Sequence, residues 1–288
     1  MTGASEPSPI NTVLVVGAGT MGGGIAQVLA EAGIETVLTD ADPGALERGL
    51  ATISGRWDRA LQSGRRSVEA ITEARKALRS GALDDAARCD LAIEAIVEKL
   101  DTKTELFKTL ARIAPPDTYF ASNTSSIAIT ALGQASGRPE RLVGMHFFNP
   151  VPVLPLVEIV RGMATSDETV TMATALARKI GKTPVVVNDS PGFVANRILL
   201  PMINEAVFTV EAGVASAGDI DNVMMLGMSH PMGPLALADL IGLDICLDIM
   251  ETLHRDFGDD KYRPAPLLRR MVAAGRLGRK TGHGFFAY

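Results

Sequence analysis

Residues 12–24 read TVLVVGAGTMGGG, and this stretch decides the fold. Its first five residues are β-branched or aliphatic, a pattern typical of a buried parallel strand. Gly17, Gly19 and Gly22 follow with GxGxxG spacing, and apolar residues then recur at helical spacing as far as position 31. In this context Gly17 permits a tight turn, Gly19 lets a diphosphate approach the backbone, and Gly22 lets the helix pack on the strand. The stretch therefore predicts a strand–turn–helix unit that binds a dinucleotide.

A carboxylate stands at the end of the next predicted strand, 36–39. Asp40 comes 23 residues after Gly17, close to the spacing of about 20 at which an acid binds the ribose of a dinucleotide. A carboxylate there accepts hydrogen bonds from a 2′-hydroxyl and repels a 2′-phosphate, so we expect NAD rather than NADP. The diphosphate is expected on the N–H groups that open the helix, at Thr20 and Met21. The alternative is a glycine-rich turn in an α/β protein that binds no cofactor.

Composition excludes several classes of protein. The chain has 288 residues, 47% hydrophobic and 21% charged, as expected for a globular protein of two domains. A net charge of −5 and a pI of about 5.5 give no overall reason to expect nucleic acid or an anionic membrane as partner. Cys89 and Cys246 lack the spacing of a metal or redox site, so we expect reduced thiols, no metal and a cytoplasmic location. An uncharged run at 7–30 is interrupted by glycines and polar residues, and no basic residue precedes Arg48, so we expect neither a membrane span nor a targeting segment.

Strands and helices alternate in the first two thirds of the chain, which predicts a doubly wound, Rossmann-type α/β domain over residues 1–189. Strands are predicted at 12–16, 36–39, 91–95, 118–121, 141–145, 155–160 and 183–188. Helices are predicted at 20–31, 43–62, 67–79, 101–112 and 165–181. The helix at 43–62 opens with Asp42 as its N-cap and Pro43 at its first position, and the helix at 165–181 opens on a capping box from Thr165 to Glu168.

The remaining chain has helical periodicity without further strands, which predicts an all-helical second domain over residues 190–288. Its helices are predicted at 191–211, 219–226, 234–257 and 266–274, with a kink at Pro201. These helices are rich in apolar residues, so we expect the second domain to close over substrate and to pair two copies of the chain as a homodimer.

Polar residues follow several strands, at the edge of an open α/β sheet where ligands bind. Residues 122–126 read SNTSS, more polar groups than a helix cap needs. His146 ends one apolar strand, and Glu158 lies inside the next. A buried carboxylate needs a partner, so we expect the two to pair, with Glu158 fixing the imidazole tautomer and stabilising the imidazolium. Asn196, on the first helix of the second domain, is expected to project into the cleft.

Basic residues gather after Asp40 in an otherwise acidic protein. Arg56, Arg59, Arg65 and Arg66 fall within eleven residues. They form either a solvated helix face or a site for the phosphates of a large anionic substrate.

Along its whole length the sequence resembles the L-3-hydroxyacyl-coenzyme A dehydrogenase family. The segments that carry the resemblance are GAGTMG at 17–22 with Asp40, EAIVE at 94–98, SNTSS at 122–126, HFFNPVP at 146–152 with Glu158, PGF at 191–193 with Asn196-Arg197, HPMGP at 230–234 and KTGHGF at 280–285.

The resemblance implies NAD-dependent oxidation of the 3-hydroxyl group of a (3S)-3-hydroxyacyl-coenzyme A, expected to be short-chained like 3-hydroxybutyryl-CoA, or the reverse reduction. It implies that His146 is the general base, that Glu158 orients it, and that Ser125 and Asn196 hydrogen-bond the substrate. Residues implied to line the cofactor site besides the glycine turn and Asp40 are Glu98, Lys103, Ser125, Asn149 and Lys280.

The sequence departs from the family where better-known members use Ser and Lys to hold the coenzyme A phosphates. There it offers basic residues, and Arg56 and Arg59 are the candidates for that contact. Two other functions stay open. One is a related 3-dehydrogenase of a free hydroxy acid or a sugar acid such as gulonate. The other is a structural protein that kept the fold, as some lens crystallins have.

Overall fold

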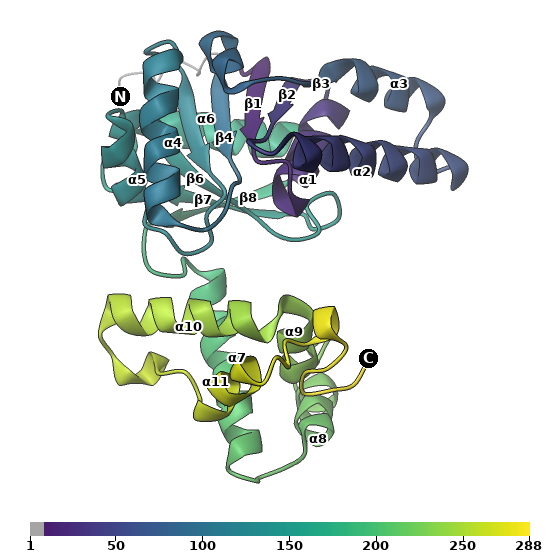
Figure 1. Ribbon diagram of the computed structural model, residues 1–288, viewed down its shortest axis with the longest axis vertical. Helices are drawn as coiled ribbons and strands as arrows, with labels where there is room; N and C mark the ends of the chain where they lie inside the picture. The colour runs from purple at the N-terminus through teal and green to yellow at the C-terminus, as the bar shows by residue number, and fades with distance from the viewer. Residues whose placement is uncertain (1–8) are drawn as a thin grey trace. The chain divides into compact units, whose positions relative to one another are not determined.

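The computed structural model describes residues 9–288, which form two compact units (Figure 1). The first unit ends at Asp189, and the second runs over Ser190–Tyr288. Within the described residues, no helix is both long and apolar enough to cross a bilayer.

The first unit is built on a sheet. Within residues 9–288, eight strands form a sheet in the order β3-β2-β1-β4-β5-β6-β7-β8. Strands β1 to β6 run parallel, β7 is antiparallel to β6, and β8 is parallel to β7. The doubly wound, Rossmann-type arrangement is therefore confirmed. The strands are β1 (Thr12–Val16), β2 (Glu35–Thr39), β3 (Leu78–Ser80), β4 (Leu91–Glu94), β5 (Tyr119–Ser122), β6 (Leu142–Phe147), β7 (Leu156–Arg161) and β8 (Thr183–Asn188).

Helices flank this sheet (Figure 1). Residues of α1 and α6 share a buried core cluster with β1, β6 and β7, while α4 packs against α5. The α-helices are α1 (Thr20–Glu31), α2 (Pro43–Gln62), α3 (Val68–Ala77), α4 (Leu100–Ile113), α5 (Ile129–Ser136) and α6 (Asp167–Lys179), with 3-10 turns at Leu83–Arg88 and Pro139–Arg141.

Two helix starts illustrate local control of the fold. Asp42 caps α2 as predicted, because its carboxylate accepts the Gly44 N–H at 2.9 Å and Pro43 occupies the first helical position. The predicted capping box at α6 is wrong. Ser166, not Thr165, is the cap, and Glu168 instead accepts a hydrogen bond from the Tyr119 hydroxyl.

Two short elements of the first unit escaped the sequence patterns. Residues 78 and 79, predicted to end a helix, instead form β3 together with Ser80 and pair with β2 at the sheet edge. Helix α5, Ile129–Ser136, follows the polar segment 122–126 in a stretch where no helix was predicted.

The second unit is helical, as predicted. Its helices are α7 (Ala195–Glu211), α8 (Ala217–Asn222), α9 (Pro234–Ile241), α10 (Leu243–Phe257) and α11 (Pro266–Ala273), with a π-helical turn at Val223–Gly227 and 3-10 turns at Asp260–Tyr262 and Arg279–Thr281. They enclose their own apolar core, which includes Leu200, Leu235 and Leu253.

Backbone conformation shifts two boundaries in this unit. The first helix begins at Ala195 rather than 191, because Gly192 and Phe193 have φ angles of 73° and 51°, in the left-handed region. The helix predicted at 234–257 is broken into α9 and α10 by Gly242, whose φ is 107°.

Candidate active site

The glycine turn between β1 and α1 depends on two glycines for its own geometry. Gly17 has a φ of 107° and donates its N–H to the Thr39 carbonyl at 2.8 Å, and a Cβ there would lie 2.4 Å from the Ala95 carbonyl oxygen. A Cβ at Gly22 would lie 1.8 Å from the Gly17 carbonyl oxygen. A Cβ at Gly19 would meet no protein atom within 4 Å. The protein itself therefore requires Gly17 and Gly22, whereas Gly19 leaves room for a ligand against the backbone.

A cavity of about 950 Å³ opens beside this turn. Its lining includes Gly17, Gly19, Thr20, Met21 and Asp40, so it brings together the predicted cofactor-binding residues of the turn except Gly22, which is packed inside. The Asp40 carboxylate accepts hydrogen bonds from the Ala18 N–H at 2.7 Å and the Asp42 N–H at 2.9 Å, which fix its position at the cavity wall. The volume of the cavity, the open space beside Gly19 and the carboxylate of Asp40 at the end of β2 all fit NAD.

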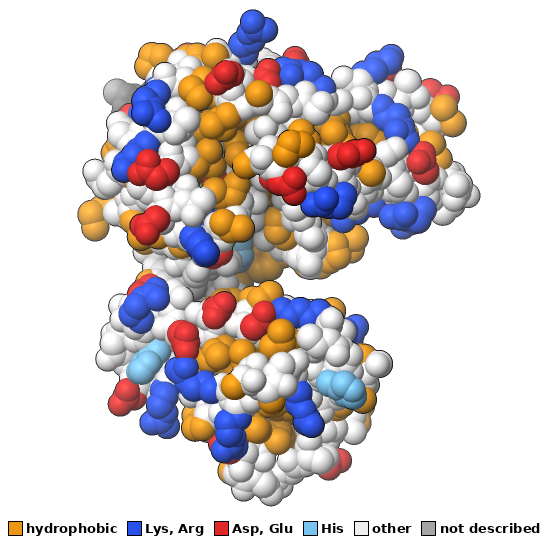
Figure 2. Space-filling model, in the orientation of Figure 1, with side chains coloured by type: hydrophobic (Ala, Val, Ile, Leu, Met, Phe, Trp, Pro, Cys, Tyr) orange, Lys and Arg blue, Asp and Glu red, His pale blue; other side chains and the backbone are white. Residues whose placement is uncertain are grey.

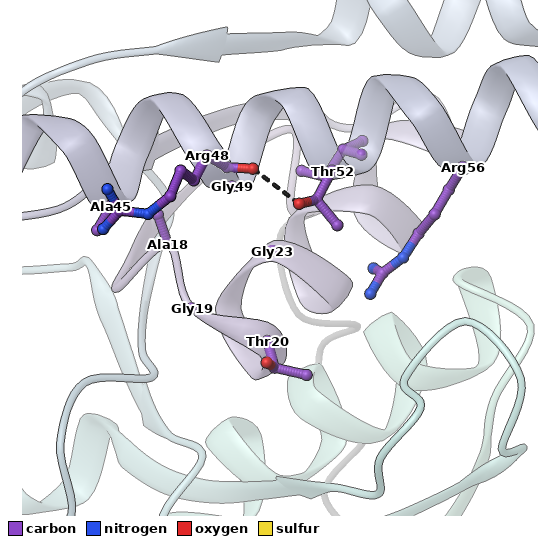
Figure 3. A pocket seen from close by; sticks show the side chains of 10 residues that line it. Ala18, Gly19, Thr20, Gly23, Ala45, Arg48, Gly49, Thr52 and Arg56 are labelled. Carbon is purple, nitrogen blue, oxygen red and sulfur yellow. Dashed lines mark hydrogen bonds between the residues drawn. The ribbon is translucent and has the colours of Figure 1, made fainter. Parts of the chain in front are cut away.

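A smaller cavity of about 270 Å³ shares Gly19 and Thr20 with the first and opens toward α2 (Figure 3). Arg48, Thr52 and Arg56 line it from positions four residues apart, which lie on one face of α2. Arg56 extends toward α1, where its guanidinium donates to the Gln27 side chain at 3.2 Å. The i, i+4, i+8 spacing would have revealed Arg48 and Thr52, which the sequence reasoning missed.

The other arginines of the cluster are outside this cavity. Arg59 is exposed and does not contribute to the cavity lining, Arg65 bonds to Ser63, and Arg66 pairs with Glu31 at 2.9 Å. Figure 2 shows basic side chains over α2 and α3 interspersed with acidic ones. Of the two residues named for the phosphate contact, the structure therefore brings Arg56 to the cavity and leaves Arg59 at the surface.

His146 and Glu158 meet as a cross-strand pair. His146 is the fifth residue of β6 and lies opposite Glu158 in the antiparallel register with β7. The imidazole Nδ1 and a Glu158 carboxylate oxygen are 2.7 Å apart, and the two residues are only 6% and 2% exposed. Because the carboxylate faces Nδ1, it fixes the tautomer that carries a proton there and makes Nε2 the nitrogen that exchanges a proton with a substrate. The predicted pair is thus present.

The polar segment after β5 is held by Glu98. A single carboxylate oxygen of Glu98 accepts hydrogen bonds from the Thr124 hydroxyl, from the Ser125 N–H at 3.0 Å and from the Ser126 N–H at 3.1 Å. Burial of the carboxyl opposes its ionisation, but the charge of Lys103 and the hydrogen bonds from Thr124 and Ser125 outweigh burial, so the pKa of Glu98 is lowered. Asn123 links the segment to the end of β6 by accepting the Phe147 N–H at 2.9 Å.

Lys103 lies between two carboxylates. Its ammonium is 2.6 Å from Glu94 and 3.0 Å from Glu98, and its side chain is 1% exposed. The resemblance implied that Lys103 lines the cofactor site; the structure buries its side chain and holds the ammonium between the two carboxylates, and its part in cofactor binding stays a prediction. Glu94, which was quoted in the family segment without a role, is the missed member of this cluster. A charged residue inside the apolar run 91–95 was the available signal.

The remaining predicted residues are Asn149, Asn196 and Lys280. Asn149 is exposed just beyond β6 and precedes Pro150 in a cis peptide bond. Asn196 lies in the first turn of α7 and Lys280 pairs with Asp244 at 2.6 Å, both within the helical unit. Participation of these two residues in the site of the first unit stays a prediction.

The sequence was also compared with known proteins. A family model described as "3-hydroxyacyl-CoA dehydrogenase, NAD binding domain" matches residues 12–190, and "3-hydroxyacyl-CoA dehydrogenase, C-terminal domain" matches residues 192–288. The chain belongs to the 3-hydroxyacyl-CoA dehydrogenase family. It is therefore an NAD-dependent oxidoreductase, and the cofactor inferred from Asp40 is confirmed.

Individual members of the 3-hydroxyacyl-CoA dehydrogenase family match along nearly the whole chain. A "Probable 3-hydroxybutyryl-CoA dehydrogenase" from Bacillus subtilis (strain 168) is 54% identical over 280 residues, 97% of this chain and 98% of that protein. A 3-hydroxybutyryl-CoA dehydrogenase from Bradyrhizobium diazoefficiens is 50% identical over 280 residues, 97% of this chain and 96% of that protein. The crystal structure of the (S)-3-hydroxybutyryl-CoA dehydrogenase from Ralstonia eutropha superposes with a TM-score of 0.94 at 48% identity, covering 97% of this chain and 99% of that one.

Proposed function

We propose that this enzyme oxidises (3S)-3-hydroxybutyryl-CoA to acetoacetyl-CoA with NAD, or catalyses the reverse reduction. The observation that carries the proposal is the buried His146–Glu158 pair at 2.7 Å in the unit that also holds the dinucleotide cavity. Oxidation of an alcohol by NAD needs a base for the hydroxyl proton, and this pair supplies one. The names of the relatives support the short acyl chain.

His146 performs the proton transfer in this proposal. Its Nε2 takes the proton of the 3-hydroxyl group, and Glu158 stabilises the imidazolium that results. NAD, when bound, supplies the acceptor for the hydride that leaves C3. In the reverse direction the imidazolium returns its proton to the 3-keto oxygen. General base catalysis of this kind contributes about 10²–10⁴ in rate.

Other side chains bind and orient the reactants. We assign Ser125 and Asn196 to the substrate oxygens, and Glu98, Asn149 and Lys280 to the cofactor, with Lys103 supporting Glu98. Arg56 is assigned to the coenzyme A phosphates, because it lines the small cavity together with Arg48 and Thr52. Arginine forks suit phosphate oxygens.

We further propose a cytoplasmic homodimer. Both cysteines are free and buried, as in reducing compartments. The helical unit exposes large apolar side chains at Ile198, Leu226 and Met228, which a second copy would cover. Size-exclusion chromatography with light scattering tests the dimer, and a monomeric mass at micromolar concentration would contradict it.

Absorbance of NADH tests the activity. The purified enzyme is mixed with NADH and either acetoacetyl-CoA or free acetoacetate, and in a second assay with NAD and either 3-hydroxybutyryl-CoA or gulonate. We expect turnover with the CoA thioesters and little with the free acids. Turnover of the free acids alone would replace the proposal by the hydroxy-acid alternative, and no turnover of any substrate would leave a structural protein.

A further inference from the structure

The cluster formed by Glu94, Lys103 and Glu98, here termed the lysine bridge, has no part in the proposed proton transfer, yet both of its carboxylates contact the substrate loop. That loop is the segment Ser122–Ser126. Lys103 bridges Glu94 at 2.6 Å and Glu98 at 3.0 Å. Among the described residues, the ion pairs of Lys103 are those with these two carboxylates.

Both carboxylates of the lysine bridge contact the loop. Glu94 accepts the Ser122 hydroxyl at 2.6 Å with one oxygen, while the other accepts the Ile96 N–H at 2.7 Å and the Lys103 ammonium. Glu98 accepts the N–H groups of the following serines, as described above. Both ends of the loop are therefore hydrogen-bonded to carboxylates that pair with the same buried ammonium, that of Lys103.

Charge and burial explain why the bridge needs Lys103. Glu94 is 0% exposed and Glu98 is 37% exposed at the side chain, so the first carboxylate cannot be stabilised by water and the second only in part. Without the ammonium, two carboxylates would face each other in a poorly solvated space, and a proton on Glu98 would weaken the hydrogen bonds that it accepts from the loop.

We propose that Lys103 is a positioning residue: it keeps Glu98 in the carboxylate form that holds the 124–126 backbone, and through that loop it places Ser125 for the substrate. This inference rests on the proposed function, which assigns Ser125 to a substrate oxygen. The lowered pKa of Glu98 agrees with it, since Lys103 is the largest cause that lowers that pKa against burial.

The decisive measurement is a pH profile of acetoacetyl-CoA reduction for Lys103→Met. In this direction His146 works in its protonated form, so a loss of kcat/KM at low pH reports another group. Loss of the ammonium should raise the pKa of Glu98, because burial raises this pKa and the positive charge of Lys103 that lowers it is then absent. We expect kcat/KM to fall about 100-fold, the cost of a misplacement near 1 Å. We also expect the profile to gain a limb that declines toward low pH.

A double variant identifies the group behind that limb. In Lys103→Met with Glu98→Gln the limb should vanish, because an amide does not titrate. A limb that persists would overturn the relay through Glu98. Lys108→Met is the matched control, since Lys108 lies on the same helix but pairs with Glu105 at the surface at 2.7 Å. It should retain wild-type kinetics.

Two further outcomes are decided by the same set of proteins. Lys103→Met with a wild-type rate and profile would overturn the inference alone, whereas an inactive wild-type enzyme would overturn the proposed function and this inference with it. If Lys103→Met does not fold, the partly exposed Glu98 carries the test through Glu98→Gln, Ser125→Ala and their double variant. Losses that do not add support a shared path through Ser125, and losses that add would refute it.

Discussion

Replacing Glu158 by Gln tests the acid–base pair directly. The substitution keeps the size of the side chain but removes the charge that faces His146 at 2.7 Å. Both residues are nearly inaccessible to water, at 6% and 2% exposure, so solvent does not compensate for the lost charge. A hydrogen bond to a charged group contributes about 1.5–3 kcal/mol, and each 1.36 kcal/mol is tenfold in rate, so kcat should fall about 10- to 150-fold.

The assay is 3-hydroxybutyryl-CoA oxidation followed by NADH absorbance. The KM values for both substrates should change little, because Glu158 acts on the imidazolium and not on binding. Glu168→Gln serves as the control: it removes the charge of an exposed carboxylate that accepts a hydrogen bond from Tyr119, at the opposite end of strand β5 from Ser122.

A double-variant cycle separates orientation of the base from a general loss of structure. If Glu158 acts through His146, then His146→Gln should cost at least about 100-fold, and adding Glu158→Gln should cost almost nothing more. A kcat for Glu158→Gln within threefold of wild type, or losses that multiply in the double variant, would refute the reasoning.

Four further outcomes are expected. Asp40→Ala should raise the KM for NAD about tenfold or more through loss of the ribose contact, with the KM for acetoacetyl-CoA unaltered, and an unchanged KM for NAD would remove Asp40 from that role. Arg56→Met should raise the KM for acetoacetyl-CoA while Arg59→Met does not, since Arg56 lines the small cavity and Arg59 does not; equal effects in steady-state kinetics would contradict this. Gly17→Ala should lower the free energy of unfolding in urea by about 1–3 kcal/mol or more, given its φ of 107° and the Ala95 carbonyl 2.4 Å from the added Cβ, and a variant as stable as wild type would be inconsistent with the turn described. Burial raises the pKa of Cys246 to about 12, so this thiol should react with alkylating reagents at pH 8 only after unfolding, and rapid labelling of the folded enzyme would show that its environment is misassigned.

The central strands could be predicted because a buried parallel strand is a continuous apolar run, and Gly17 and Asp40 mark where two such runs end. Strand β3 could not, because residues 78–80 carry no such run and become a strand only by pairing with β2. The break at Gly242 was missed for a similar reason. A glycine inside an apolar helical pattern looks tolerable until tertiary packing, here the Leu243 N–H donating to Leu277, selects its positive φ.

The residues of the candidate site likewise differ in how far the sequence could predict their contacts. His146 and Glu158 were predictable as a pair because a carboxylate in an apolar strand needs a partner. Lys103 was not, since a lysine on an amphipathic helix usually faces solvent, and its burial depends on Glu94 and Glu98 approaching from a strand and a loop. Arg56 was found in a local cluster of arginines, but the residues of α2 that line the cavity with it include Arg48 and Thr52, and Arg59, about one turn further along the helix, is not among them.

The antiparallel pairing of β6 with β7 has a consequence for redesign. His146 lies opposite Glu158 because of the register in which β6 and β7 pair. The buried apolar faces of the two strands hold that register, whatever the length of the segment that connects them. The connection can therefore be lengthened at the exposed Val153, away from Asn149 and the buried Val151, with the base and its partner left in place. Deleting a single residue within β7 would have the opposite effect: the side chains would exchange faces of the sheet, and an aliphatic neighbour, Val157 or Ile159, would replace the carboxylate.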